Sequence, residues 1–95
     1  MDKKKLRFAI LKEIDTGNKE LSEAQFGVDE ETFDDAVNFL KSEEYISGVM
    51  YADNRPYAFG STVYLTEKGE TYLAENNAWA KAYKGLKEIR DWLKL

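Results

Sequence analysis

Only two segments of this chain have the composition of β-strands, and they lie next to each other. Residues 45–51 and 57–64 are rich in aromatic and β-branched side chains and flank the turn-like sequence Ala-Asp-Asn-Arg-Pro at 52–56. This pattern predicts one β-hairpin with a five-residue turn. The remaining segments have helical spacing, so the chain is restricted to an α+β fold in which helices accompany a single small sheet.

The first predicted helix has two apolar sides. It covers residues 3–16, where apolar residues recur at four-residue spacing and Gly17 can end the helix. Phe8 and Leu11 lie on a different side of the helix from that stripe, so we expect another segment to pack against that side. The residues of the main stripe are Leu6, Ile10 and Ile14.

Two more helices are predicted before the hairpin. A short one begins after the N-cap Ser22 and ends at Gly27. The next is capped by Asp29 and runs to about Glu43, and its apolar residues form one continuous stripe. That stripe comprises Phe33, Ala36, Val37 and Leu40.

Two helices are predicted after the hairpin. Thr66 caps the first, and Asn76 with Asn77 can end it in the left-handed conformation. The second runs from about 78 to 95 and is too apolar along one side to remain exposed. We expect it to pack on the first helix within one monomer; pairing with a second copy in a homodimer is the alternative. Its apolar residues are Trp79, Ala82, Tyr83, Leu86, Ile89 and Leu93.

Composition excludes most enzyme classes. A chain of 95 residues is expected to form one domain, 1–95, and it contains no Cys and no His. It therefore has no disulfide, no thiolate or imidazole metal site and no nucleophile activated by His. No phosphate-binding loop or paired carboxylates are recognisable, so we expect a non-enzymatic protein without a cofactor. No apolar run reaches the length of a membrane span, and a soluble, cytoplasmic protein is predicted.

The order of three helices followed by a hairpin is that of a winged helix-turn-helix, in which the third helix reads DNA and the hairpin is the wing. The chain also resembles the YjcQ-type proteins of Gram-positive bacteria and their phages and prophages. The resemblance implies a winged-helix-like fold and a phage or prophage origin in a bacterial host cell, and it implies no particular activity. It rests on KLRFAILKEI (5–14), FDDAVNFLKSEEYI (33–46), DNRPY (53–57), LTEKGETYLAEN (65–76) and WAKAYKGLKEIRDWL (79–93).

Charge argues against DNA as the first choice of partner. Residues 13–53 carry twelve acids and two bases, whereas residues 1–12 carry five bases and one acid. The outer face of the third helix is acidic, although DNA-reading helices usually present bases or amides there. We therefore predict a regulatory or adaptor protein that binds an unidentified protein partner through this surface. The candidate residues are Glu31, Asp34, Asp35, Asn38 and Phe39.

Alternatives to this surface remain open. The carboxylates at the start of the third helix can simply complement the helix dipole and lie in solvent. Phe39 is either exposed or buried beneath the hairpin or the second helix. The aromatic residues of the hairpin are interpreted as packing residues of the core and sheet.

The alternative function is that of a winged-helix DNA-binding transcriptional regulator. Arg55 at the predicted wing tip has the chemistry to enter a minor groove or to bind phosphate. The candidate DNA contacts are Asn38, Lys41, Asn54 and Arg55.

Overall fold

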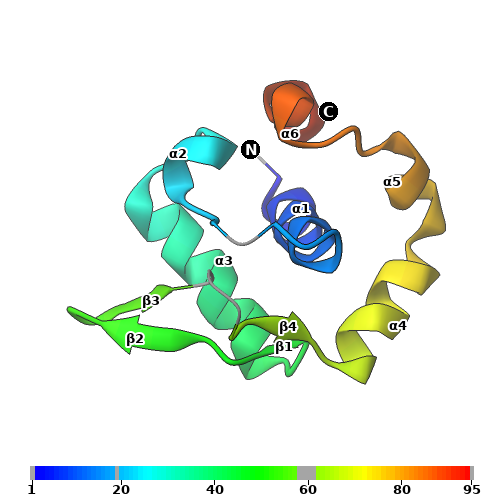
Figure 1. Cartoon of the computed structure of the whole chain (residues 1–95). Coiled ribbons are helices and arrows are strands. Elements are labelled where there is room, and N and C mark those ends of the chain that lie inside the picture. The colour runs from blue at the N-terminus through cyan, green and yellow to red at the C-terminus, as the bar shows by residue number, and fades with distance from the viewer. Residues whose placement is uncertain (1, 19, 58–61, 95) are drawn as a thin grey trace.

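The computed structural model describes residues 2–18, 20–57 and 62–94, and it shows an α+β fold, as predicted. Figure 1 shows α1 at the centre, with α2, α3 and the hairpin on one side and α4, α5 and α6 curving round the other. The helices are α1 (Lys3–Asp15), α2 (Glu23–Phe26), α3 (Glu30–Ser42), α4 (Glu67–Glu75), α5 (Asn77–Ala82) and α6 (Ile89–Lys94). The strands are β1 (Ile46–Ser47), β2 (Met50–Ala52), β3 (Arg55–Tyr57) and β4 (Tyr64–Leu65).

The predicted boundaries of the first three helices are confirmed. These boundaries depend on caps formed by residues that are close in the sequence. Asp2 accepts hydrogen bonds from the backbone of the first turn of α1, and Ser22 with Gln25 forms a capping box on α2. The Asp29 carboxylate accepts a hydrogen bond from the Thr32 backbone N–H at 2.7 Å and begins α3. Each cap satisfies backbone donors that a helix start would otherwise leave unpaired.

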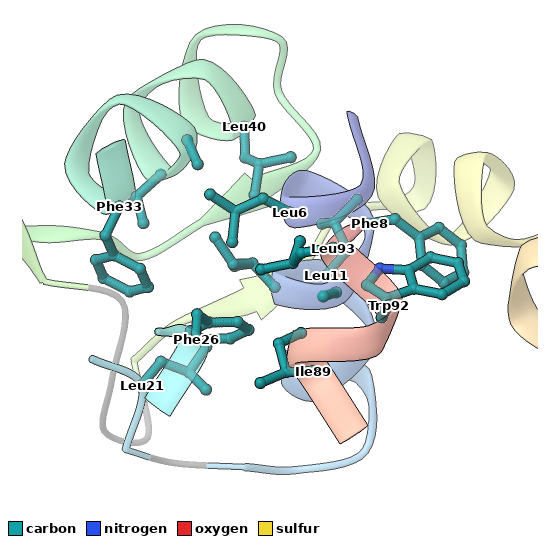
Figure 2. Close-up of a cluster of buried hydrophobic side chains, with 14 of the residues drawn as sticks. Leu6, Phe8, Leu11, Leu21, Phe26, Phe33, Leu40, Ile89, Trp92 and Leu93 are labelled. Atoms are coloured by element: carbon teal, nitrogen blue, oxygen red, sulfur yellow. The ribbon is translucent and has the colours of Figure 1, made fainter. Parts of the chain in front are cut away.

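The core is built on both sides of α1. Leu6, Phe8 and Leu11 are almost completely inaccessible to solvent. Figure 2 shows Leu6 pointing toward Leu40 of α3 and Phe8 lying beside Trp92 of α6. The two apolar sides of α1 are therefore each covered, one by α3 and the other by the C-terminal segments.

The hairpin turn is tighter than predicted. β2 pairs with β3 so that Ala52 lies opposite Arg55, which leaves only Asp53 and Asn54 in the turn. Both have positive φ angles, 53° and 63°, which suits a type I′ turn. The five-residue turn was wrong because Asp and Asn tolerate this left-handed backbone and let pairing begin immediately, with Pro56 already inside β3.

A second, separate ladder joins β1 to β4, with Ile46 opposite Leu65. Gly48 lies between β1 and β2 with φ +82°, and a side chain at this position would overlap the carbonyl oxygen of Thr62. Glycine is therefore required where the two halves of the hairpin approach each other. The central part of the second predicted strand, residues 58–61, lies outside the described residues.

Helix α4 confirms its predicted start, since the Thr66 hydroxyl accepts a hydrogen bond from the Gly69 backbone N–H at 3.1 Å. Its end differs from the prediction. Asn76 has φ −104° and is not left-handed. It ends α4 and begins α5 with no intervening loop, so no left-handed residue is needed there.

The single C-terminal helix predicted over 78–95 is wrong. The helix is interrupted after α5, where Gly85 has φ +95°. A short 3₁₀ turn, η1 (Leu86–Glu88), then leads into α6. In one continuous helix, residues 79 and 92 would lie roughly 20 Å apart along the axis, at 1.5 Å per residue. The break instead brings the rings of Trp79 and Trp92 to 5.7 Å, centroid to centroid.

This break lets three aromatic rings surround Phe8. Its ring centroid lies 5.6 Å from Trp79, 6.3 Å from Tyr83 and 5.8 Å from Trp92. The Trp92 indole N–H donates to the Lys5 carbonyl at 2.9 Å, so the polar atom of this buried ring is satisfied. We call Trp79, Tyr83 and Trp92 the aromatic collar.

Candidate functional site

The hairpin is attached to α2 and α3 through one arginine. Arg55 of β3 donates from Nε and Nη2 to the two carboxylate oxygens of Asp34, at 2.8 and 3.0 Å. The same guanidinium lies 3.1 Å from Glu30 and 3.4 Å from Glu23. We call these four side chains the Arg55 cluster. It joins three elements of the fold through charge-assisted hydrogen bonds.

Electrostatics strengthens the attachment of Arg55. The hydrogen bond to Asp34 raises the pKa of the guanidinium above its usual value, and the charges of Asp34, Glu30 and Glu23 act in the same direction. The side chain is 24% exposed, so the cluster lies at the rim of the molecule. The positive charge predicted for the wing tip is thus neutralised by the protein's own carboxylates.

Tyr51 provides a second contact between the hairpin and α3. Its hydroxyl donates to the Asn38 side-chain oxygen at 2.7 Å, and the Lys41 ammonium lies 4.4 Å from the centre of its ring. Asn38, Lys41 and Arg55 therefore all contact other parts of this protein. Asn54 is the remaining candidate DNA contact, and its side chain is exposed at the turn.

The candidate protein-binding residues have different surroundings. Asp34 and Asn38 contact the hairpin, whereas Glu31 and Asp35 are exposed on the outer face of α3. Phe39 is half-buried on another side, where the Arg7 guanidinium of α1 lies 3.6 Å from its ring centre. Arg7 of α1 is thus one neighbour of Phe39, and α1 was not predicted as its neighbour from the sequence.

Two tyrosines that sequence reasoning assigned to packing are exposed in the structure, and so is Met50. Met50, Tyr51 and Tyr64 are 61%, 49% and 58% exposed. Tyr45, by contrast, packs against Tyr72 with ring centroids 5.0 Å apart. All three residues of β2 are exposed, so this strand has no buried face, and its apolar composition alone did not indicate that.

The site shows no arrangement suited to holding a metal ion. Among the described residues, no group of three or more carboxylates is placed to coordinate one. Three carboxylates do converge, but the Arg55 guanidinium occupies the space between them. Within the same ranges, no helix is long and apolar enough to cross a membrane.

Comparison with known proteins gives one consistent result. The family model described as "YjcQ protein" matches residues 4–92. The chain is 62% identical over 94 residues to YjcQ of Bacillus subtilis (strain 168), an alignment that covers 99% of this chain and 100% of that protein. The solution NMR structure of Bacillus subtilis YjcQ is similar, with a TM-score of 0.71, 61% identity, and coverage of 78% of this chain and 95% of that one.

Proposed function

The chain belongs to the YjcQ family, and from this premise we propose that it is a winged-helix-like, non-enzymatic regulatory or adaptor protein of phage or prophage type. It acts by binding a protein partner with a basic surface. The order of three helices and a hairpin supports the winged-helix-like description. The burial of Phe8 under the aromatic collar supports a monomer, since Ile89 and Leu93 are buried and Trp79 and Tyr83 are half-buried within one chain.

The observation that carries this proposal is the position of the hairpin. In a DNA-binding winged helix, the third helix enters the major groove and the wing reaches an adjacent part of the duplex. Here, Arg55 and Tyr51 hold the hairpin against α3. The same contacts occupy the groups that would read bases or neutralise phosphates.

Apolar side chains and carboxylates are both exposed on the strands and α3. Met50, Tyr51 and Tyr64 are exposed, and exposed carboxylates lie on and just after α3. Exposed aromatic and Met side chains are typical of the centres of protein interfaces, while charges at the rim select the partner and speed association. The chemistry of this surface fits a basic partner with an apolar centre. The exposed carboxylates are Glu30, Glu31, Asp35, Glu43 and Glu44.

The rival function, a DNA-binding transcriptional regulator, would require the hairpin to leave α3. Release would free Arg55 but would also leave Glu23, Glu30 and Asp34 unneutralised next to the incoming phosphates. Repulsion between these carboxylates and DNA opposes that rearrangement. The geometry therefore supports a protein partner better than it supports DNA.

The test uses the full chain as bait with two matched charge-reversal variants. Glu31→Lys/Asp35→Lys changes the exposed face of α3, and Glu70→Lys/Glu75→Lys makes the same charge change on α4. The proposal expects one host protein to bind wild type and the α4 variant, and to bind the α3 variant at least about tenfold more weakly, a difference of about 1.4 kcal/mol. Equal binding to all three chains would contradict it.

A DNA arm completes the test. At about 150 mM salt, we expect binding to random duplex to be weaker than the usual non-specific range of roughly 10⁻⁴ to 10⁻⁶ M, because few phosphates can be neutralised. Nanomolar binding to a genomic fragment that is lost in Arg55→Gln would overturn the proposal in favour of the DNA-binding regulator.

A further inference from the structure

A separate pocket lies between α1, α3 and α4, away from the contacts between the hairpin and α3. Its volume is about 410 Å³, within the range of small-molecule sites. Its lining is unusual for so small a protein, because four aromatic side chains and two bases converge there. They are Phe39, Tyr45, Tyr72, Trp79, Lys4 and Arg7.

Arg7 is the distinctive group of this pocket. Its guanidinium lies 3.6 Å from the centre of the Phe39 ring and is half-buried. Among the described residues, no carboxylate lies within ion-pair distance of Arg7, although Glu31 and Asp35 line a neighbouring hollow with it. Stacking on Phe39 restricts the guanidinium plane, leaving its N–H groups available to an anion.

The position of Arg7 contrasts with that of Arg55. Arg55 is surrounded by three carboxylates, whereas Arg7 has an aromatic ring and no counter-ion among the described residues. Partial burial of an unpaired cation is unfavourable, and a bound anion would relieve that cost. Lys4 lies three residues earlier on α1 and adds a second positive charge at the same pocket.

The aromatic wall has an ordered geometry. Tyr45 and Tyr72 are tilted by 35° with ring centroids 5.0 Å apart. Burial raises the pKa of the Tyr72 hydroxyl, and the nearby charge of Arg7 acts in the opposite direction, which places the cation close to this ring. Rings of this kind bind other planar ring systems by stacking or edge contacts.

We propose that this pocket binds a small planar aromatic anion, with the ring of the ligand against Tyr45, Tyr72 and Trp79 and its negative group on Arg7 and Lys4. Two sources supply this chemistry: a nucleoside monophosphate or an aromatic carboxylate. The site shares none of its lining residues with the exposed face of α3 or with the hairpin. It therefore stands or falls independently of the proposed protein partner.

The experiment is a titration of the full chain, followed by the backbone amide and Trp indole signals in ¹H–¹⁵N NMR spectra. AMP and indole-3-acetate are the two probes, and adenosine, inorganic phosphate and indole are their matched fragments. We expect saturable shifts at Arg7, Phe39 and the Trp79 indole with at least one anion, and each fragment alone should bind at least about tenfold more weakly. Whether AMP or indole-3-acetate binds tighter identifies the source of the ligand.

Two variants connect the binding to the pocket. Arg7→Gln should weaken binding of the better probe by about tenfold or more, while Arg90→Gln removes the same charge from the exposed face of α6 and should change nothing. Lys4 is exposed, so Lys4→Gln gives a second reading if Arg7→Gln perturbs the fold.

Three results would each overturn the proposal. The first is the absence of saturable shifts with either anion up to about 10 mM, because a dissociation constant above that concentration does not indicate a specific site. The second is equal binding by a neutral or ring-free fragment. The third is an equal loss of affinity in Arg90→Gln and Arg7→Gln.

Discussion

The C-terminal segments and the hairpin are both attached to the α1–α3 core, but by different forces. The aromatic collar surrounds Phe8 and excludes water from it, with Phe8 fully buried and Trp92 only 5% exposed. The hairpin is attached through the Arg55 cluster, in which the side chain of Glu30 is 59% exposed, and through the buried Pro56 of β3. One attachment depends on the burial of apolar surface, whereas the other also includes charges near solvent.

This difference assigns separate roles to the two sides of the molecule. Salt does not screen the burial of aromatic surface, whereas it does screen partly exposed ion pairs. The collar side therefore maintains the architecture. The hairpin side exposes Met50, Tyr51 and Tyr64, and its ion pairs are the part of the fold that salt can weaken.

The largest loss of stability is expected from truncation of Phe8, the residue at the centre of the collar. Phe8→Ala should lower the free energy of unfolding by about 3–5 kcal/mol, because the collar would enclose a cavity. Urea denaturation measures this, and Leu40→Ala on the α3 side is the matched core substitution, with an expected loss of about 2–5 kcal/mol. A loss below about 1 kcal/mol for Phe8→Ala would mean that the collar contributes little to stability.

Tyr83→Phe tests the polar part of the collar. The Tyr83 hydroxyl donates to the largely buried Glu13 carboxylate at 2.6 Å, and Asn18 donates to the other oxygen at 3.1 Å. Removing the hydroxyl should cost about 1–3 kcal/mol, since a buried carboxylate loses one donor. Tyr64→Phe, at an exposed ring, is the control and should change stability by less than about 0.5 kcal/mol.

Tyr83 also predicts a pH dependence. Burial, followed by the hydrogen bond and charge of Glu13, raises the pKa of Tyr83 above its ordinary value of 10.0. Because the folded state favours the protonated hydroxyl, its contribution is complete below pH 10 and is lost as the pH rises above it. Thermal melts between neutral and alkaline pH should show a smaller decline in Tyr83→Phe; an identical decline would contradict this.

Arg55→Gln should loosen the hairpin without unfolding the core. We expect amide exchange at Tyr51 and Ala52 to accelerate by about tenfold, because opening of the hairpin in the variant no longer requires the Arg55 ion pairs to break. The midpoint of global unfolding should change much less. High salt should reproduce part of this effect in wild type and little of it in the variant, whereas an equal salt response in both chains would show that Arg55 does not control the attachment.

The smallest expected effect concerns the start of α3, next to the Arg55 cluster. Hydrogen bonds from Thr32 lower the pKa of Asp29 below 3.8. The contribution of this carboxylate is present above that value and is lost as the pH falls through the pKa of the folded state. Asp29→Asn keeps the cap but cannot titrate, so its melting temperature should approach that of wild type in acid. A constant difference across the acid range would remove Asp29 as the cause.

Part of the candidate site was predictable, and part was not. Glu31 and Asp35 lie exposed on α3 as the helical periodicity required. Asp34, Asn38 and Arg55 were also identified as candidates. Their contacts between α3 and the hairpin were not predicted, because helical spacing does not indicate where a hairpin packs. The contact of Phe39 with Arg7 of α1 was not predicted for the same reason.

The sequence by itself determined where α1 to α4 begin, because their caps join residues only two or three positions apart, as Asp29 and Thr32 do. It also determined that one hairpin follows three helices. Only the tertiary structure decided that the hairpin lies on α3 and that the last segment breaks at Gly85. Those outcomes depend on Arg55 reaching Asp34 across 21 positions and on Trp92 reaching Lys5 across 87. Contacts at such separations form only when the chain closes long loops, so no local pattern of residues encodes them.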